Sequence, residues 1–194
     1  MIITIIILTM SIFSLSVAGN ITGKITAHGA KNGADAVIYI EKVEGKTFSA
    51  PKEHAKMDQI HLAFKPRVLP VLAGTTVDFL NSDNVLHNVF SPDKCTGKFN
   101  LGSWPQGQTK PYTFETAGCT ATLLCNVHPE MEGFVVVLSN PYFAVSGQDG
   151  AYKIKDVPAG KYNLKIWHGK LKGKDAEVEV PATGDATVNF DIHK

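Results

Sequence analysis

The stretch "TATLLCNVHPEMEGFVVVL", residues 120–138, places a short polar loop between two apolar segments. Thr, Val, Leu and Phe dominate both segments, 120–124 and 133–138, a composition typical of β-strands. The loop holds three side chains that bind soft or borderline metals at three-residue intervals: Cys125, His128 and Met131. The stretch therefore predicts two strands joined by a candidate metal loop, although the spacing alone does not identify a site.

Segments of the same kind recur along the rest of the chain. Gly, Pro, Asn or Asp separate them at intervals of roughly ten residues, and no segment keeps a helical period. This pattern favours an all-β sandwich over alternating strands and helices. We expect strands at residues 22–28, 36–43, 60–64, 68–72, 75–81, 88–90, 112–115, 120–124, 133–138, 151–153, 160–167, 176–180 and 186–192.

The overall composition is that of a globular protein. The chain has 194 residues, of which 44% are hydrophobic, and a formal net charge of +1. This length suffices for one large domain or two small ones. The pI is near 7.7 and the chain has no long basic run, so the sequence gives no sign of a basic surface that binds phosphates. We therefore expect no nucleic-acid partner.

The first eighteen residues have the features of a secretory signal peptide. They contain no charged side chain, run apolar from Ile2 to Val17, and end in the small residues Ser16 and Ala18. We expect cleavage near Ala18 and no membrane span afterwards. A retained anchor is the alternative, because no Lys or Arg precedes the run, although the run is short for a core about 30 Å thick. Either way we expect a periplasmic or otherwise extracytoplasmic protein.

Export bears on the three cysteines, Cys95, Cys119 and Cys125. In an oxidising compartment two of them are expected to pair, which leaves one over. If Cys125 holds a metal, Cys95 and Cys119 form the disulfide. The alternative is that both are buried thiols.

A blue-copper site needs two imidazoles and a thiolate, with a weak axial ligand that is usually Met. The loop supplies one imidazole, so the other must come from elsewhere. His87, in "VDFLNSDNVLHNVFS", follows the expected strand 75–81 and a polar turn, and begins the next strand. That position is the rim of a sandwich, where a loop returning 38 residues later can meet it. We interpret the remaining histidines as structural or solvent-facing: His28, His54, His61, His168 and His193.

The segment 52–138 resembles the cupredoxins, the small blue copper proteins. The resemblance rests on "FKPRVLPVLAGTTVDFLNSDNVLHNVF" and "TAGCTATLLCNVHPEMEGFVVV", and the Cys-x-x-His-x-x-Met spacing is most similar to amicyanin. It implies a Greek-key sandwich holding one type 1 copper ion, with Asn88 bracing the ligand loop. The implied equatorial ligands are His87, Cys125 and His128, and the axial ligand is Met131. Glu132 is an alternative fourth ligand.

Such a ligand set implies one-electron transfer between Cu(I) and Cu(II). Four protein ligands leave no open position for a substrate, so we expect no enzymatic activity.

Leu86, Pro105 and Pro129 are candidates for an apolar patch at the electron port. The expected partner is a redox protein of cytochrome c or amine dehydrogenase type. The alternatives are a copper carrier or sensor without redox traffic, and an interaction module with a structural copper site. Five lysines form a solvated face or a docking patch: Lys161, Lys165, Lys170, Lys172 and Lys174.

The tail carries a second resemblance, to the carboxypeptidase regulatory-like, transthyretin-like sandwich. It rests on "SGQDGAYKIKDVPAGKYNLKIWHGKL", and the usual opening strand of such domains has its counterpart in "ITGKITAHGAKNGADAVIYIEKV", residues 21–43. We therefore predict a discontinuous sandwich, 19–50 plus 141–194, with a cupredoxin domain at 51–140 inserted. The alternative gives residues 20–50 to the cupredoxin. The combination resembles plastocyanin-like proteins of the methylamine-utilisation type.

Overall fold

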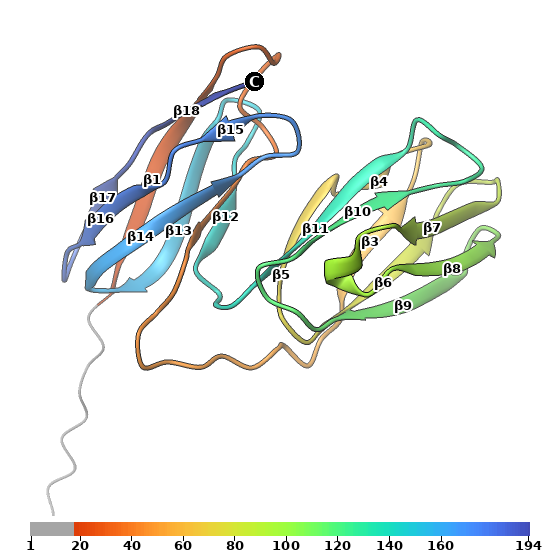
Figure 1. The fold of residues 1–194 in the computed structure, drawn as a ribbon, viewed down its shortest axis with the longest axis horizontal. Coiled ribbons are helices and arrows are strands. Elements are labelled where there is room, and N and C mark those ends of the chain that lie inside the picture. Colours follow the sequence, from red (N-terminus) through yellow and green to blue (C-terminus); the bar gives the residue numbers. More distant parts are fainter. Residues whose placement is uncertain (1–17) are drawn as a thin grey trace, which may run out of the picture.

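The computed structural model describes residues 18–194, which form strands, loops and one short 3₁₀ turn, η1 (Lys94–Thr96). The expected all-β class is confirmed. Figure 1 shows two β-sandwiches beside each other, with a long extended segment leading from β2 of one to β3 of the other. The predicted signal peptide, apart from Ala18, lies outside the described residues. Among residues 18–194, no helix has the length and hydrophobicity that a membrane span requires.

The inner sandwich consists of strands β3 to β11. One sheet has the order β5-β11-β10-β7-β8 and the other has the order β4-β3-β6-β9. The strands are β3 (Ala55–Gln59), β4 (Phe64–Lys65), β5 (Val68–Leu72), β6 (Thr75–Asn81), β7 (His87–Ser91), β8 (Phe99–Trp104), β9 (Thr109–Phe114), β10 (Thr120–Leu124) and β11 (Glu132–Leu138).

Alternating side chains of these strands fill the space between the two sheets. In β6, Thr75, Val77, Phe79 and Asn81 are buried while the residues between them are partly exposed. This is the two-residue period of a strand with one buried face. The same core contains Trp104 and extends to the chain segment that carries the candidate ligands.

The outer sandwich consists of β1, β2 and β12 to β18. One sheet has the order β13-β1-β18-β15, with β17 also paired to β1, and the other has the order β12-β2-β14-β16. The strands are β1 (Ala18–Ala27), β2 (Val37–Ile40), β12 (Phe143–Val145), β13 (Ala151–Pro158), β14 (Gly160–Trp167), β15 (Lys172–Gly173), β16 (Ala176–Val180), β17 (Asp185–Thr187) and β18 (Phe190–His193).

The two ends of the chain share the sheets of the outer sandwich. β2 pairs antiparallel with β14 from Leu164 opposite Ile40 to Trp167 opposite Val37, and β1 pairs antiparallel with β13. Within the described residues, neither β1 nor β2 pairs with a strand of the inner sandwich. This is the pairing that a discontinuous outer unit requires. The division into domains at residues 50 and 141 stays a prediction.

Strand β11 is buried on both faces, which explains why "GFVVVL" is a continuous apolar run. Val135 and Val137 face the core of the inner sandwich. Phe134, Val136 and Leu138 belong to a separate buried cluster with Val37 of the outer sandwich, and Trp167 packs against it. The rings of Phe134 and Trp167 meet edge to face with centroids 5.1 Å apart. The outer sandwich therefore covers the second face of β11.

The structure differs from the predicted strands in several places. Residues 60–64 were expected to form a strand, but β3 ends at Gln59 and a turn follows. His61 and Leu62 in this turn have φ values near +54°, which strand residues do not adopt. The prediction also lacked β3, β8, β12 and β15, and it gave β17 and β18 as one strand, 186–192. The mostly exposed side chains of β8 hide the alternation on which the prediction depended.

Gly23 of β1 lies where neighbouring segments of the outer sandwich approach each other closely. A Cβ at this position would overlap the carbonyl oxygen of Val188 and lie 2.7 Å from the ring of Tyr152. We expect Gly23→Ala to lower the free energy of unfolding by about 3 kcal/mol, the upper range for overpacking, because backbone must move. Calorimetry should show this. Gly147→Ala is the control, since its Cβ meets only the Asp149 side chain, at 3.1 Å, and one more distant atom. Equal losses in both variants would contradict the prediction.

Candidate metal centre

Three of the four predicted ligands bring their donor atoms together. Cys125 Sγ lies 4.0 Å from Nδ1 of His87 and 3.9 Å from Nδ1 of His128, and the two Nδ1 atoms are 3.1 Å apart. Nitrogen and sulfur atoms bound to one ion at about 2.0–2.3 Å lie roughly 3–4 Å from one another. Among the described residues, this is the one group of three such side chains close enough to hold a metal.

Neighbouring strands create this convergence. His87 opens β7, and Cys125 directly follows β10, the antiparallel neighbour of β7. The start of one strand therefore lies beside the end of the other, and the backbone N–H of Asn88 reaches Cys125 Sγ at 3.5 Å. His128 lies on the loop between β10 and β11. His87 and Cys125 are buried, with 0% and 3% exposed, whereas His128 is partly exposed.

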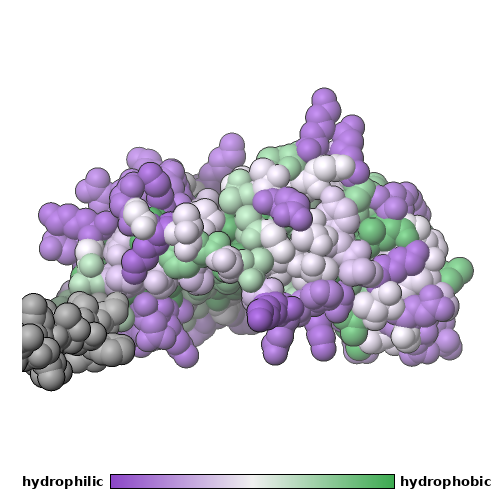
Figure 2. Space-filling model, turned by 90° about the horizontal axis from the view of Figure 1, so that it is seen from below, coloured by the Kyte–Doolittle hydropathy of each residue, from purple (hydrophilic) through white to green (hydrophobic). Residues whose placement is uncertain are grey.

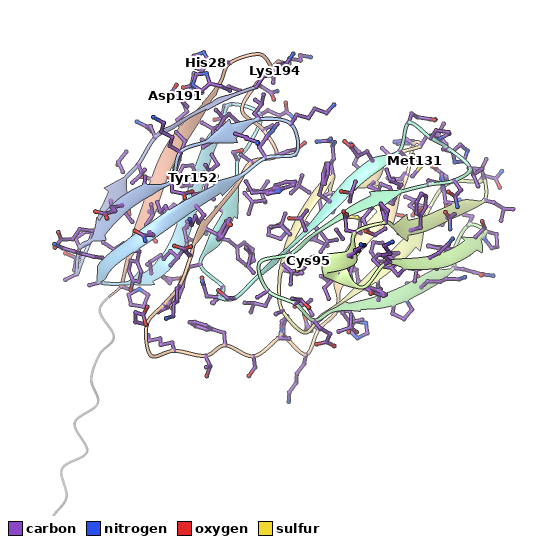
Figure 3. All side chains as sticks on the ribbon, in the orientation of Figure 1. His28, Cys95, Met131, Tyr152, Asp191 and Lys194 are labelled. Atoms are coloured by element: carbon purple, nitrogen blue, oxygen red, sulfur yellow. A yellow bond between two sulfur atoms is a disulfide. The ribbon has the colours of Figure 1, made fainter. Side chains whose placement is uncertain are left out.

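The loop then returns into the core at Met131. Its backbone N–H donates to the carbonyl of His128 at 3.0 Å, which closes a turn. The Met131 side chain is 1% exposed and belongs to the same buried cluster as Cys125. Figure 3 shows Met131 at the end of the inner sandwich near this loop.

Glu132, the alternative fourth ligand, has another partner. Its Oε2 accepts from Nη2 of Arg67 at 2.6 Å, and Nη1 of the same guanidinium lies 3.6 Å from Asp35. Glu132 is therefore part of an ion-pair network that reaches the outer sandwich. Of the two side chains considered for the fourth position, Met131 is the one packed with Cys125.

Asn88 braces the ligand loop, as the resemblance implies. Its Oδ1 accepts from the backbone N–H of Asn126 at 3.2 Å. Its Nδ2 donates to Oδ1 of Asn100 at 2.8 Å and to the carbonyl of Gly102 at 3.1 Å. These bonds tie the residue after Cys125 to β7 and β8, so the expected bracing is confirmed.

Asp83 is a residue of the site that the sequence motifs did not indicate. Its Oδ2 lies 2.9 Å from Nε2 of His87, the ring nitrogen that faces away from Cys125. Burial would raise the pKa of the Asp83 carboxyl, but hydrogen bonds from Leu62 N–H, the His87 ring and His61 N–H together lower it. The signal in the sequence was an Asp four residues before a candidate ligand, within a polar turn.

The expected disulfide between Cys95 and Cys119 is present, and Cys125 is a free, buried cysteine. The Cα atoms of the pair are 5.7 Å apart, within the usual range for a disulfide. The bond joins η1 to the residue before β10. Cys125 follows the other end of that strand, so its thiol remains free for a metal.

Apolar side chains are exposed around the ligand positions. Leu86 precedes His87 and is 53% exposed, and Val127 precedes His128 and is 50% exposed. Val85 and Leu62 are also large exposed hydrophobic residues, and the predicted patch members Pro105 and Pro129 are exposed. Hydrophobic residues are visible at this end of the inner sandwich in Figure 2.

The other histidines have separate contacts. His28 lies 3.1 Å from Asp191 and stacks on His193, and His54 lies 2.9 Å from Asp78. His168 Nδ1 accepts the backbone N–H groups of Lys170 and Leu171. Burial, followed by the nearby Arg67 charge, lowers the pKa of His168. This role in a turn accounts for His168 without a ligand.

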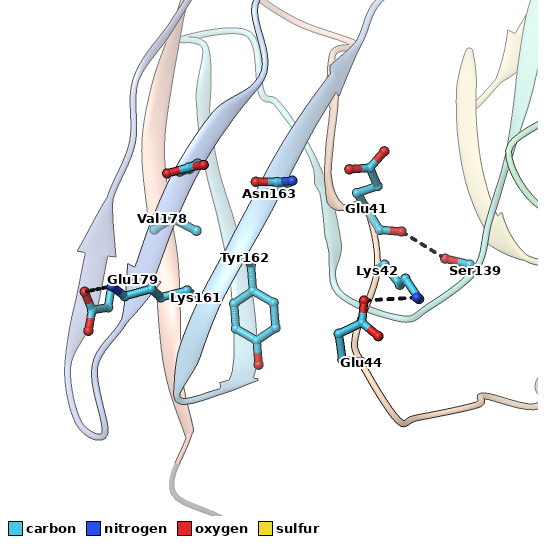
Figure 4. A pocket seen from close by; sticks show the side chains of 10 residues that line it. Glu41, Lys42, Glu44, Ser139, Lys161, Tyr162, Asn163, Val178 and Glu179 are labelled. Atoms are coloured by element: carbon cyan, nitrogen blue, oxygen red, sulfur yellow. Dashed lines mark hydrogen bonds and ion pairs between the residues drawn. The ribbon is translucent and has the colours of Figure 1, made fainter.

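The outer sandwich has a shallow groove of about 880 Å³ beside β14 and β16 (Figure 4). Charged side chains line much of it and pair with one another, as Lys42 does with Glu44 at 3.0 Å and Lys161 with Glu179 at 3.7 Å. Lys165 is likewise paired, with Glu41 and Asp175. The predicted lysine face is therefore partly neutralised.

Comparisons with solved structures find cupredoxins along part of the chain. A copper-containing nitrite reductase from Thermus scotoductus is 23% identical over 53% of this chain, which spans only 26% of the reductase, with a TM-score of 0.43. A purple cupredoxin from Nitrosopumilus maritimus is 28% identical over 43% of this chain and 98% of its own, with a TM-score of 0.38. A Cu(I) form of an amicyanin variant is 28% identical over 53% of this chain and 98% of its own, with a TM-score of 0.41.

No protein-family model matches the chain, and a comparison with curated proteins finds no match. Because each TM-score above is below 0.5, we base the function on the donor atoms of this chain. A buried thiol beside two imidazole nitrogens suits copper, since thiolates favour Cu(I) and imidazoles bind both oxidation states.

Proposed function

We propose that the protein is an extracytoplasmic electron carrier with one type 1 copper ion, held by His87, Cys125 and His128 with Met131 as the axial ligand. The observation that supports this most is the spacing of Sγ and the two Nδ1 atoms, 3.1–4.0 Å. Met131 favours copper over zinc, because the common zinc ligands are Cys, His, Asp and Glu. A copper ion in this site supplies one-electron redox chemistry.

The protein's own residues keep the site rigid and dry. His87 and Cys125 are held by paired strands, Asn88 ties the loop to β7 and β8, and the core excludes water from the thiol. A donor set that does not rearrange suits an ion that changes charge without changing position. Four ligands leave no open position, so we propose a carrier and not an enzyme.

His128 is the candidate point of electron entry and exit. It is the partly exposed ligand, and Leu86 and Val127 are exposed beside the two imidazoles. An apolar surface allows a redox partner to approach closely without the cost of desolvating charges. We propose a redox protein of cytochrome c or amine dehydrogenase type as the partner.

Optical and EPR spectra of the copper-loaded protein, followed by a redox titration, test this function. We expect an intense thiolate-to-Cu(II) charge-transfer band that disappears and returns over a reversible one-electron cycle. A protein that binds Cu(I) alone and stays colourless on oxidation would instead be a copper carrier or sensor.

A charge placed in the apolar patch is expected to slow electron exchange. In Leu86→Lys, two molecules that meet through this surface repel each other, so the electron self-exchange rate should fall about tenfold or more at low salt. The charge-transfer band should stay unchanged. Val145→Lys is the matched control, because Val145 is also exposed, at 36%, but lies on β12 of the outer sandwich. Equal rates in the two variants would rule out this surface as the port.

A further inference from the structure

The two candidate imidazole ligands have different surroundings. His87 Nδ1 faces Cys125 and His128, while Nε2 faces the carboxylate of Asp83 at 2.9 Å. Among the described residues, the polar contacts of the His128 ring are all made through Nδ1, and the ring is partly exposed. An ionised carboxylate only accepts hydrogen bonds, so Nε2 of His87 carries the proton and the Nδ1 lone pair faces the metal site.

Asp83 is itself held in place. Its Oδ1 accepts from the His61 N–H at 2.7 Å, and its Oδ2 accepts from the Leu62 N–H at 2.9 Å. Its own N–H donates to Oδ1 of Asn81 at 3.0 Å. His61 and Leu62 both have a left-handed backbone conformation in the turn after β3. This conformation directs both of their N–H groups toward the Asp83 carboxylate. The side chain is 14% exposed, so water screens the carboxylate only partly.

From this geometry we propose that Asp83 is a positioning residue of the metal centre, which fixes the His87 tautomer and favours the oxidised ion. The inference rests on the proposed function, because it concerns the ligand role of His87. The hydrogen bond from His87 Nε2 to Asp83 leaves the Nδ1 lone pair facing the metal site and makes the imidazole a stronger metal ligand. The negative charge behind the ring stabilises Cu(II) more than Cu(I), because Cu(II) has the greater positive charge. Asp83 therefore lowers the reduction potential.

Asp83→Asn removes the charge while it keeps the size of the side chain. We expect Cu(II) affinity to fall by roughly 10–100-fold, as for other outer-sphere partners of metal ligands. Cu(I) affinity should fall about tenfold less, which corresponds to a rise in reduction potential of about 59 mV. Competition titrations with each oxidation state and voltammetry of the full chain measure these changes.

Asp83→Ala removes the acceptor as well. In the copper-free protein, ¹⁵N NMR of the wild type should show His87 protonated on Nε2, whereas the Ala variant should show a mixture of tautomers. Asp78→Asn is the control for both, because Asp78 pairs with His54 at 2.9 Å on the same sandwich and loses the same charge. It should change the affinities by less than about twofold, since screening weakens a distant surface charge.

The outcomes separate this inference from the function on which it rests. A lower Tm in both Asp83 variants, with potential and His87 tautomer unchanged, would make Asp83 only a turn residue and overturn the inference. If the wild type binds no copper through Cys125, the proposed function fails. The tautomer of His87 in the copper-free protein still reports whether Asp83 positions the ring.

Discussion

Cys125→Ser is expected to abolish the thiolate-to-copper charge-transfer band completely. The sulfur is the soft donor of the set and lies 3.9–4.0 Å from both imidazole nitrogens. A serine hydroxyl remains protonated at neutral pH and is a poor ligand for Cu(I). Cu(I) affinity should therefore fall by more than the roughly 10–100-fold typical of an outer-sphere change. Absorption spectroscopy and competition titration against a Cu(I) chelator measure the two effects.

The fold should survive this substitution, because Ser and Cys differ little in volume and Cys125 lies outside the disulfide. Circular dichroism of the copper-free variant checks this. His54→Gln serves as a control, since His54 contacts Asp78 at 2.9 Å and belongs to no ligand group. It should retain the full band. A band that persists in Cys125→Ser would refute the ligand assignment.

The second large effect concerns stability. We expect the double substitution Cys95→Ala and Cys119→Ala to lower the free energy of unfolding by about 3 kcal/mol. The bond closes a loop between residues 24 positions apart, and its loss returns that chain entropy to the unfolded state. For a chain of this length, about 3 kcal/mol corresponds to a fall in Tm of roughly 6–12 °C. Calorimetry of the copper-free forms measures it.

The copper spectrum should not change in that variant. β10 (Thr120–Leu124) separates Cys119 from Cys125, and the contacts that brace the loop come from Asn88. The wild-type protein treated with a reductant is the matched comparison, and it should show the same fall in Tm. An unchanged Tm would mean that the bond does not stabilise the protein by restricting the unfolded chain, and a lost band would mean that the bond supports the metal site.

Local patterns predicted much of this protein. The alternation of apolar and polar residues, broken by Gly and Pro, indicated an all-β fold, since a strand buries every second side chain. The Cys-x-x-His-x-x-Met spacing and the position of His87 after a polar turn indicated the candidate ligands, because one short loop and one strand end can bring their donor atoms together. Even so, the pattern misassigned residues 60–64, where a left-handed turn occurs instead.

The tertiary structure alone decided contacts between distant segments. Residues 37–40 pair with residues 164–167, although the inner sandwich separates the two segments in the sequence. Arg67 forms an ion pair with the carboxylate of Glu132, the residue after Met131. The carboxylate of Asp83 meets the far nitrogen of His87 because the turn after β3 holds it there. Such contacts depend on strand register and on the packing of one sheet against another. A linear pattern identifies the side chains that can bind a metal, while register and packing determine which atoms face it.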